Sequence, residues 1–355
     1  MRHPRKHLVL TAGLLAALAI SGCGSTAGKK AADRPESTTI TIATHDSWAM
    51  SKEVMAAFTK QTGITVKIQK NDDAGALTNK LVLTKGRPLA DGVFGIDNTF
   101  ATRAIDEGVL APYTPAAAPA SVARFNLAGD GSTYLTPIDY GDVCMNTDNT
   151  WFAKNKLPVP TTLDDLTKPA YKDLLVVPGA TASSPGMAFL LTTIAKYGDG
   201  WKAYWQKLID NGLKIDAGWS DAYFVDFTAG GGKGDRPIVL SYSSSPPDSV
   251  PPGGTEPRTS AMLDTCFRQV EYAGVLAGAK NPKNAAKFID FMLTRAFQVE
   301  LPGQMYVYPV VAGVPLPKNW ATWAPLSPKP YAVPPAEITS NRAEWLREWR
   351  DLTTR

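Results

Sequence analysis

Hydrophobic and polar positions alternate over residues 39–44, in the β-branched run Thr-Ile-Thr-Ile-Ala-Thr, and this pattern predicts a strand. Apolar residues then recur at helical spacing over residues 52–62, which predicts a helix that ends at Gly63. A second β-branched run follows at residues 64–68. A strand, a helix and a strand joined by short connections predict a parallel sheet with helices packed against it.

Strand and helix patterns continue to alternate along the rest of the chain. Two long extended stretches, 134–146 and 268–275, are interpreted as strands that cross between two lobes. A chain of 355 residues is too long for one ordinary core and suits two lobes of about 150 residues each. Further strands are predicted at 91–98 and 174–177, and further helices at 76–84, 100–107, 187–197 and 282–293.

The stretch at residues 218–247 is interpreted as part of a ligand site. It contains an aromatic-rich turn and short helix, a glycine break, an apolar strand, and the hydroxyl-rich loop Ser-Tyr-Ser-Ser-Ser at 241–245. In open α/β sheets, ligands bind outside the carboxyl ends of the strands, where this loop would open. The stretch therefore predicts one wall of a small-molecule cleft, and the rest of the chain supplies the other walls.

The first 22 residues form a targeting segment, with three basic residues followed by an apolar run at 8–20 that is too short to span a bilayer stably. The sequence Ile-Ser-Gly-Cys at its end resembles the lipobox of bacterial lipoproteins. This resemblance implies cleavage before Cys23 and lipid attachment to that cysteine, and the alternative is an ordinary secretory signal with an incidental cysteine. Both alternatives predict export. The small, polar and charged residues 23–37 predict a flexible tether.

The charge balance of the exported chain is nearly neutral. The whole sequence has 37 basic and 33 acidic residues, and three of the basic residues lie in the targeting segment. A near-neutral chain argues against nucleic acid as a partner. An apolar fraction of 44% with 20% charged residues is that of a globular protein.

Two cysteines, Cys144 and Cys266, lie in the body of the chain. In an exported protein such a pair is predicted to form a disulfide rather than two free thiols. Neither cysteine has the CxxC spacing of a metal or redox site, and His45 is the only histidine after the targeting segment. Because a zinc site needs more than one such ligand, we expect no metal and no cofactor.

Seven short motifs together resemble a known family. They are Thr44-His45-Asp46-Ser47, Gly95-Ile96-Asp97-Asn98, Asp139-Tyr140-Gly141, Ser183-Ser184-Pro185-Gly186, Gly218-Trp219-Ser220-Asp221-Ala222-Tyr223, Leu240-Ser241-Tyr242 with Ser245-Pro246, and Tyr308-Pro309-Val310. Their order and approximate spacing are similar to those of the thiamine-binding solute-binding proteins of bacterial ABC importers. The resemblance covers the chain from about residue 38 to the C-terminus.

This resemblance implies the α/β fold of the type II periplasmic-binding-protein superfamily. In that fold, each of two lobes is a mixed, mainly parallel sheet flanked by helices, and two hinge strands cross between the lobes. The expected division gives residues 38–138 and about 270–310 to the first lobe, and 139–269 and about 311–355 to the second. The resemblance further implies a monomer without catalytic activity. It would bind thiamine between the lobes and deliver it to an ABC permease, while the lipid on Cys23 attaches it to the extracytoplasmic face of the cell membrane.

The chemistry of thiamine suggests how the cleft would hold it. Its flat cationic thiazolium suits aromatic faces, which attract it by stacking and cation–π interaction. Trp219, Tyr223 and Tyr306 supply such faces, and a carboxylate such as Asp73 or Asp97 could offset the charge. From the motifs and this chemistry, the expected ligand-binding residues are His45, Asp46, Asp73, Asp97, Asp139, Tyr140, Ser183, Ser184, Trp219, Tyr223, Tyr242, Ser245, Asp248 and Tyr306.

The serines at 183 and 184 allow two interpretations. With the amides of the helix that follows them, they could hold the hydroxyl or a phosphate of the ligand. Alternatively, Ser183 or Ser184 only caps that helix.

Three residues depart from the pattern of the family. His45 stands where the resemblance leads us to expect tyrosine, Tyr306 where we expect tryptophan, and Asp248 where we expect another tyrosine. Asp248 removes one stacking face and adds a negative charge that would repel thiamine phosphates. The departures therefore favour thiamine over its phosphates and also admit another cationic heterocycle or a polyamine as the ligand.

Individual residues also suggest two other functions, ferric-ion binding and the enzymatic degradation of thiamine. Tyr306 and Tyr308 could be phenolate ligands of ferric ion, but they lie two apart on an apparent strand, so their side chains should point to opposite faces. A thiamine-degrading enzyme could use Cys144 as its nucleophile with Glu271 or Asp142 as acidic partner. A disulfide would consume the thiol that such an enzyme needs.

Overall fold

The strands of the computed structural model, which describes residues 35–354, form one sheet. Its main path runs β2-β1-β3-β10-β5-β8-β6-β7. The bounds along that path are β2 Thr65–Lys70, β1 Thr39–Thr44, β3 Gly92–Asp97, β10 Phe267–Leu276, β5 Thr136–Asp148, β8 Ile238–Tyr242, β6 Leu175–Pro178 and β7 Lys214–Asp216. Off the path, β4 Leu110–Ala111 pairs with β10, while β9 Thr259–Ala261 and β11 Tyr308–Pro309 pair with β5.

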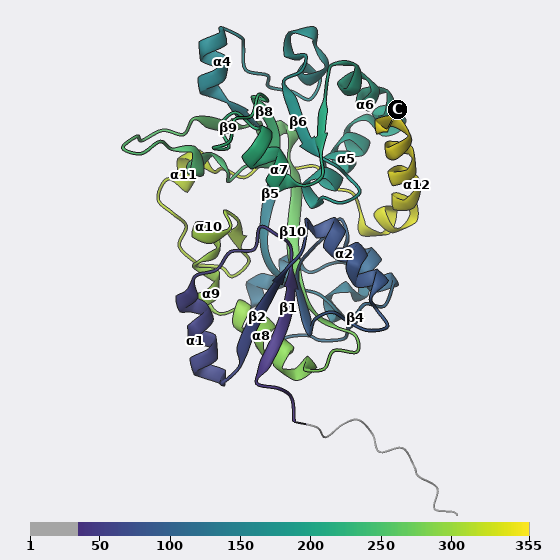
Figure 1. Cartoon of the computed structure of the whole chain (residues 1–355), viewed down its shortest axis with the longest axis vertical. Coiled ribbons are helices and arrows are strands. Elements are labelled where there is room, and N and C mark those ends of the chain that lie inside the picture. The colour runs from purple at the N-terminus through teal and green to yellow at the C-terminus, as the bar shows by residue number, and fades with distance from the viewer. Residues whose placement is uncertain (1–34, 355) are drawn as a thin grey trace, which may run out of the picture. The chain divides into compact units, whose positions relative to one another are not determined.

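Strand directions divide this sheet into two parallel parts joined by an antiparallel pair. β2 and β3 both run parallel to β1, and β7 and β8 both run parallel to β6. β5 and β10 run antiparallel to each other and to their neighbours β8 and β3. Figure 1 shows β5 and β10 passing between the part around β1 and the part around β6. We call these parts the first lobe and the second lobe, and the predicted pair of crossing strands is confirmed.

Helices cover both lobes. The longer ones are α1 Lys52–Thr62, α2 Ala74–Leu83, α5 Ser184–Tyr197, α6 Trp201–Asp210, α8 Pro282–Met292 and α12 Pro335–Thr353. The shorter ones are α3 Ala101–Asp106, α4 Asn149–Asn155, α7 Trp219–Asp221, α9 Arg295–Gln298, α10 Leu301–Gln304 and α11 Trp320–Trp323. Among the described residues, no helix has the length and hydrophobicity that a membrane span requires.

Several helix boundaries follow from side chains that cap the first turn. α1 begins after Ser51, whose hydroxyl accepts from the Val54 amide. α2 begins two residues earlier than predicted because the Asp73 carboxylate accepts from the Ala74 amide. α5 begins three residues early because Ser183 accepts from the Gly186 amide. Polar side chains at such positions satisfy amides that have no partner inside the helix.

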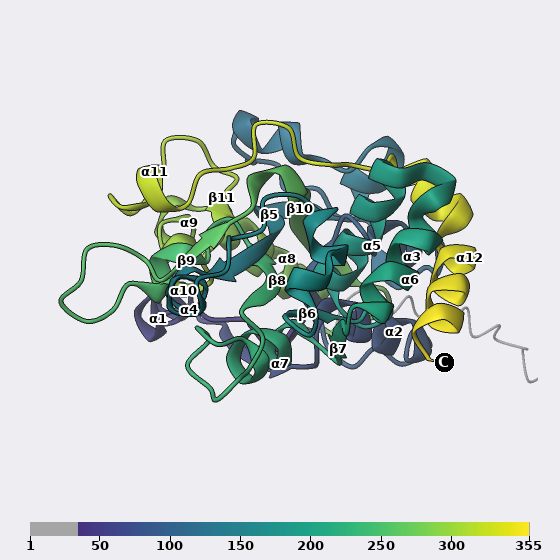
Figure 2. The ribbon, with the colours of Figure 1, turned by 90° about the horizontal axis from the view of Figure 1, so that it is seen from above.

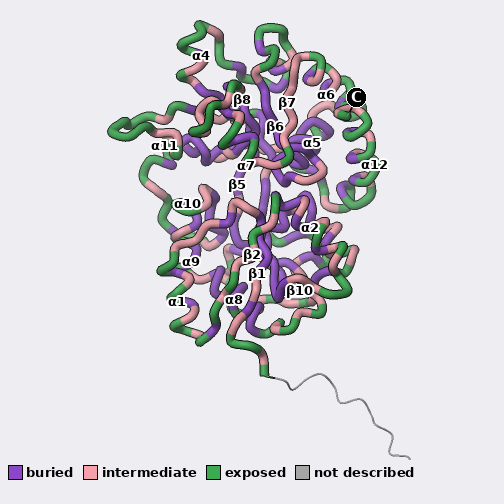
Figure 3. Tube along the Cα trace, viewed as in Figure 1, coloured by how far each residue is buried: buried purple, intermediate pink, exposed green. Residues whose placement is uncertain are grey.

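Aromatic packing fills the cores of the lobes. In the first lobe, Phe58 of α1 meets Phe288 of α8 edge to face, with ring centroids 5.1 Å apart. In the second, Trp205 of α6 lies edge to face against Trp349 of α12 at 5.6 Å. Figure 2 shows α6 and α12 together at one side of the sheet, and Figure 3 shows that burial is greatest along the central strands. α12 also contacts α3 of the first lobe.

The end of the predicted tether contacts the first lobe. The Glu36 carboxylate accepts from the amides of Lys283 and Asn284 at 2.9 and 2.7 Å, at the start of α8, where a negative charge is favourable. Ser37 donates its amide to the Asn281 side chain. Residues 1–34, which include the targeting segment and Cys23, lie outside the described residues.

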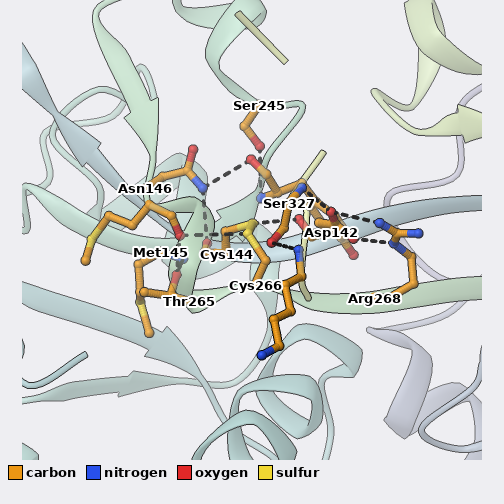
Figure 4. The surroundings of a disulfide bond; sticks show 12 residues. Asp142, Cys144, Met145, Asn146, Ser245, Thr265, Cys266, Arg268 and Ser327 are labelled. Carbon is orange, nitrogen blue, oxygen red and sulfur yellow. Dashed lines mark hydrogen bonds and ion pairs between the residues drawn. A yellow bond between two sulfur atoms is a disulfide. The ribbon is translucent and has the colours of Figure 1, made fainter. Parts of the chain in front are cut away.

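A disulfide between Cys144 of β5 and Cys266, which directly precedes β10, joins the two crossing strands (Figure 4). This confirms the predicted pairing. Both residues are buried, and the neighbouring Thr265 hydroxyl accepts from the Met145 amide at 3.0 Å. An ion pair between Asp142 of β5 and Arg268 of β10 lies beside the disulfide. The hinge region is therefore tied by a covalent bond and an ion pair in addition to its backbone ladder.

Candidate functional site

A cavity of about 420 Å³ lies between the two lobes, within the size range of small-molecule sites. Its walls come from loops at the carboxyl ends of the strands and from the starts of α2, α5 and α7. The lining residues are His45, Asp46, Ser47, Ala49, Asp73, Ala74, Ser184, Pro185, Trp219, Ser220, Tyr223, Phe224, Tyr242, Ser245, Asp248, Glu271, Gln304, Met305, Tyr306 and Val307.

One wall of the cavity is aromatic. Trp219 and Tyr223 stack with ring centroids 5.0 Å apart and an interplanar angle of 21°. Tyr242 meets Trp219 edge to face at 6.2 Å. The Trp219 indole N–H donates to the Ser241 hydroxyl at 3.1 Å, which fixes the orientation of the ring. This wall presents a flat, anchored face of the kind that binds flat cations.

The Asp73 carboxylate crosses between the lobes. On its own side it caps α2 by accepting from the Ala74 amide at 2.7 Å. From the second lobe it accepts the Ser184 amide at 3.1 Å and the Trp219 amide at 3.0 Å. Burial raises the pKa of Asp73 above its ordinary value, although the bonds from Trp219, Ser184 and Ala74 act to lower it. One carboxylate therefore ties α2 to the starts of α5 and α7.

The backbones of the two lobes also meet beside Asp73. The Ala76 amide donates to the Ala182 carbonyl at 2.9 Å. A Cβ on Gly75 would lie 2.6 Å from the same oxygen, so this approach requires glycine. Nearby, the Ser220 hydroxyl donates to the Asp46 carboxylate at 2.6 Å and forms a further bond between the lobes.

His45, which directly follows β1, forms an ion pair with Glu271 of β10. The distance between His45 Nε2 and Glu271 Oε1 is 3.2 Å. Burial lowers the pKa of His45, but the negative charges of Glu271, Asp73 and Asp46 raise it by more. The pKa of His45 is therefore above its ordinary value. Burial raises the pKa of Glu271, and His45 more than offsets this, so the net shift is downward. Gly95, at φ +97°, makes room for the imidazole, because a Cβ there would lie 2.2 Å from His45 Cδ2.

Asp139 of β5 lies opposite Glu271 in the strand ladder and is fully buried. Burial raises its pKa well above the ordinary value, and the charge of Glu271 raises it further. Burial and the charge of Glu271 therefore both favour the protonated form of the Asp139 carboxyl. His45, Glu271 and Asp139 thus form a buried row, of which His45 and Glu271 line the cavity and Asp139 lies beside it.

Asp97 lies at the end of β3 and is also buried. Its carboxylate accepts from the hydroxyls of Thr99 and Ser184 and from the Phe100 amide. Burial raises the pKa of Asp97 to about 7, and the bonds from Ser184 and Thr99 oppose that rise. Asp97 holds the Ser184 side chain in place and does not line the cavity.

Asp248 and Tyr306, at which the resemblance leads us to expect other aromatic residues, form a pair in the lining of the cavity. The Tyr306 hydroxyl donates to the Asp248 carboxylate at 2.8 Å. Burial, followed by this bond, raises the pKa of Tyr306 to about 12. Tyr306 lies at φ +55°, and its carbonyl accepts from the Ser244 hydroxyl at 2.5 Å.

Ten of the fourteen predicted ligand-binding residues line this one cavity: His45, Asp46, Asp73, Ser184, Trp219, Tyr223, Tyr242, Ser245, Asp248 and Tyr306. The remaining four lie outside the lining. Asp97 and Asp139 are buried beside it, and Ser183 caps α5. Tyr140 packs against Phe125, with ring centroids 4.4 Å apart.

Sequence reasoning missed several lining residues. Ser220 directly follows the predicted Trp219, and Glu271 was expected only as an acidic partner of Cys144. A glutamate between the apolar residues Val270 and Tyr272 of a strand was the available signal for Glu271. Gln304, Met305 and Val307 lie beside Tyr306 and carry no sequence signal of their own.

Comparison with known proteins identifies the family. The model of the bacterial extracellular solute-binding protein family matches residues 47–299. The chain belongs to this family.

Curated relatives of this solute-binding protein include two thiamine-binding periplasmic proteins. That of Brucella suis biovar 1 (strain 1330) is 32% identical over 328 residues, which cover 89% of this chain and 92% of the relative. That of Escherichia coli (strain K12) is 30% identical over 325 residues, which cover 89% of this chain and 94% of the relative.

Among solved structures, a periplasmic thiamin binding protein superposes with a TM-score of 0.77 at 29% identity, over 89% of this chain and 96% of that one. The type II periplasmic-binding-protein fold is thereby confirmed. The family binds solutes outside the cytoplasm, and this protein is therefore extracytoplasmic.

The buried row of His45, Glu271 and Asp139 generates a prediction about pH. Because the folded-state pKa of Asp139 is raised, the folded protein binds a proton that the unfolded chain releases above about pH 4, and stability is lost as the pH rises from there. Asp139→Asn keeps a hydrogen-bond donor and removes this titration. We expect its free energy of unfolding, relative to that of the unaltered protein, to increase between pH 5 and pH 8, by about 1.4 kcal/mol for each pH unit over which the folded protein keeps the Asp139 proton.

Urea unfolding at the two pH values measures this difference. Asp351→Asn, an exposed change of the same chemistry on α12, serves as the control and should show no such increase. An equal stability difference for Asp139→Asn at both pH values would mean that Asp139 does not retain its proton in the folded protein.

Proposed function

We propose that this solute-binding protein binds thiamine in the cavity between its lobes and delivers it to an ABC importer. The support is twofold. Relatives that match about nine-tenths of the chain are thiamine-binding periplasmic proteins. The cavity also has the chemistry that a flat, cationic heterocycle requires.

The observation that carries the proposal is the stacked pair Trp219 and Tyr223, which faces a lining rich in carboxylates. The thiazolium and aminopyrimidine rings of thiamine are flat, and the thiazolium is cationic. An aromatic face attracts such a ring by stacking and cation–π interaction, and Asp46 and Glu271 supply negative charge in the same cavity. A polyamine would gain the charge attraction but has no flat ring for the stacked wall.

Ferric-ion binding and thiamine degradation find less support. For ferric ion, Tyr306 lines the cavity but Tyr308 is buried and donates its hydroxyl to the Ala324 carbonyl, so the two phenols do not converge. β11 contains only Tyr308 and Pro309, and Tyr306 precedes it in a left-handed conformation.

For a thiamine-degrading enzyme, the Cys144 thiol is consumed in the disulfide.

The aromatic wall yields the first test of this function. We expect thiamine to bind the ligand-stripped purified protein and to quench its tryptophan fluorescence. Trp219→Ala should weaken binding by about 2 kcal/mol, because the stacked face and its cation–π attraction are lost. Isothermal titration calorimetry measures both affinities.

Trp345→Ala is the matched control, since Trp345 lies on α12 and is not among the lining residues. Its affinity should equal that of the unaltered protein. Absence of heat and quenching with thiamine would reject thiamine as the ligand, whereas unchanged affinity in Trp219→Ala would remove the aromatic wall from the site.

We further propose that the protein acts as a monomer anchored by lipid on Cys23. One chain supplies every wall of the cavity, and the sequence around Cys23 has the lipobox pattern. Lipid attachment would hold the protein at the membrane beside its permease, since an acyl-modified cysteine inserts in the bilayer.

The anchor is tested with Cys23→Ser expressed in a bacterial host. The unaltered protein should sediment with the membrane fraction, and the variant should shift to the soluble extracytoplasmic or uncleaved pool because it lacks the acceptor thiol. Mass spectrometry of the mature N-terminus identifies the lipid. An unmodified N-terminus at a residue other than Cys23 would contradict the anchor.

A further inference from the structure

We infer that the cavity selects thiamine itself and rejects thiamine phosphates, because the donors at the start of α5 are already used by the protein and the acidic side chains of the lining outnumber its basic ones. This inference rests on the proposed function and specifies the form of the ligand. Three observations carry it: the charges of the lining, the use of the α5 amides, and the pair formed by Asp248 and Tyr306.

The lining is strongly one-sided in charge. Among the described residues, four lining side chains are carboxylates and none is lysine or arginine; the carboxylates belong to Asp46, Asp73, Asp248 and Glu271. Lys70 donates to the Asp46 carbonyl at 3.0 Å but does not line the cavity. The His45 imidazole lies 3.2 Å from the Glu271 carboxylate. Its positive charge is therefore offset by that partner. A phosphate would therefore find repulsion without a cationic partner.

The start of α5 is the place where the sequence suggested a phosphate could bind, but its donors are committed. The Ser184 amide donates to Asp73 at 3.1 Å, and residue 185 is a proline without an amide hydrogen. The Gly186 amide donates to the Ser183 hydroxyl at 3.3 Å. The Ser184 hydroxyl donates to Asp97. The Asp73 carboxylate thus occupies the position that an anionic ligand would take at this helix.

The pair of Asp248 and Tyr306 adds a negative charge to the lining. The bond from Tyr306 holds Asp248 against the cavity. The pair presents a phenol and a carboxylate to the cavity. That pair can attract a thiazolium, but it repels a phosphate. Asp248 is exposed, so solvent screens its effect more than those of the buried Asp73 and Glu271.

A phosphate group on thiamine would bring negative charge into a cavity that carboxylates already line. A phosphate monoester carries a charge of about −1.5 to −2 at pH 7. The cavity that would have to hold it is about 420 Å³ and is lined by four carboxylates. Repulsion between such charges at low effective dielectric corresponds to weaker binding by about 30-fold or more.

The experiment is isothermal titration calorimetry of the ligand-stripped protein with four compounds: thiamine, thiamine monophosphate, thiamine diphosphate and O-acetylthiamine. The acetyl ester extends the same hydroxyl without adding charge and so separates size from electrostatics. We expect thiamine and O-acetylthiamine to bind within a few-fold of each other. Both phosphates should bind at least about 30-fold more weakly than thiamine.

A double variant assigns the selectivity to the carboxylates. Asp46→Asn with Asp248→Asn removes two lining charges and leaves the buried Asp73 and Glu271 intact, and the preference over the monophosphate should fall by about 10-fold. Asp72→Asn with Asp351→Asn is the control, because it changes the net charge equally at two exposed residues outside the lining. The control should keep the full preference.

The outcomes separate the inference from the proposed function. If both phosphates bind as tightly as thiamine, the inference is overturned and thiamine binding stands. If O-acetylthiamine is rejected as strongly as the phosphates, or if the double variant keeps the full preference, the carboxylates are not the cause and the inference is equally overturned. If thiamine itself does not bind, the proposed function fails and the inference falls with it.

Discussion

The Asp73 carboxylate is the interaction on which the arrangement of the site depends. It accepts amide hydrogens from Ala74 in the first lobe and from Ser184 and Trp219 in the second. Hydrogen bonds to a charged group contribute about 1.5–3 kcal/mol each, and a buried carboxylate without them would be strongly unfavourable. The bond to the Trp219 amide also fixes where the aromatic wall begins. Together with the bond from Ser220 to Asp46, this bond sets the position of the wall relative to the first lobe.

The crossing strands limit how the two lobes can move. β5 and β10 are joined by a ladder, by the Cys144–Cys266 disulfide and by the Asp142–Arg268 ion pair, so bending is directed to the cavity end of the strands. The register shift in the ladder at Glu271 and Tyr272 lies at that end, next to the row of His45, Glu271 and Asp139. A ligand that contacts both lobes can then shift the equilibrium between open and closed forms only through its differential affinity for them.

Much of the fold was predictable because it depends on local patterns. The boundaries of α1 and β1, the crossing strands and the disulfide all follow from periodicity, turn residues and cysteine usage. The aromatic wall was predictable because aromatics and hydroxyls cluster within one stretch of sequence. The role of Asp73 was only partly predictable, since its partners Ser184 and Trp219 are 111 and 146 residues away. The sequence also could not show that Asp97 turns toward Ser184 rather than into the cavity, or that Tyr306 adopts a left-handed conformation and bonds to Asp248.

The central claim is that Asp73 ties the two lobes together across the cavity. It is tested most directly by small-angle X-ray scattering of Asp73→Asn with and without thiamine. The asparagine keeps one acceptor for the α2 cap but directs an amide group at the Trp219 N–H. The account predicts that thiamine reduces the radius of gyration of the unaltered protein and of the neighbouring control Asp72→Asn, whereas Asp73→Asn stays more extended. Equal compaction of Asp73→Asn and the unaltered protein would contradict the account.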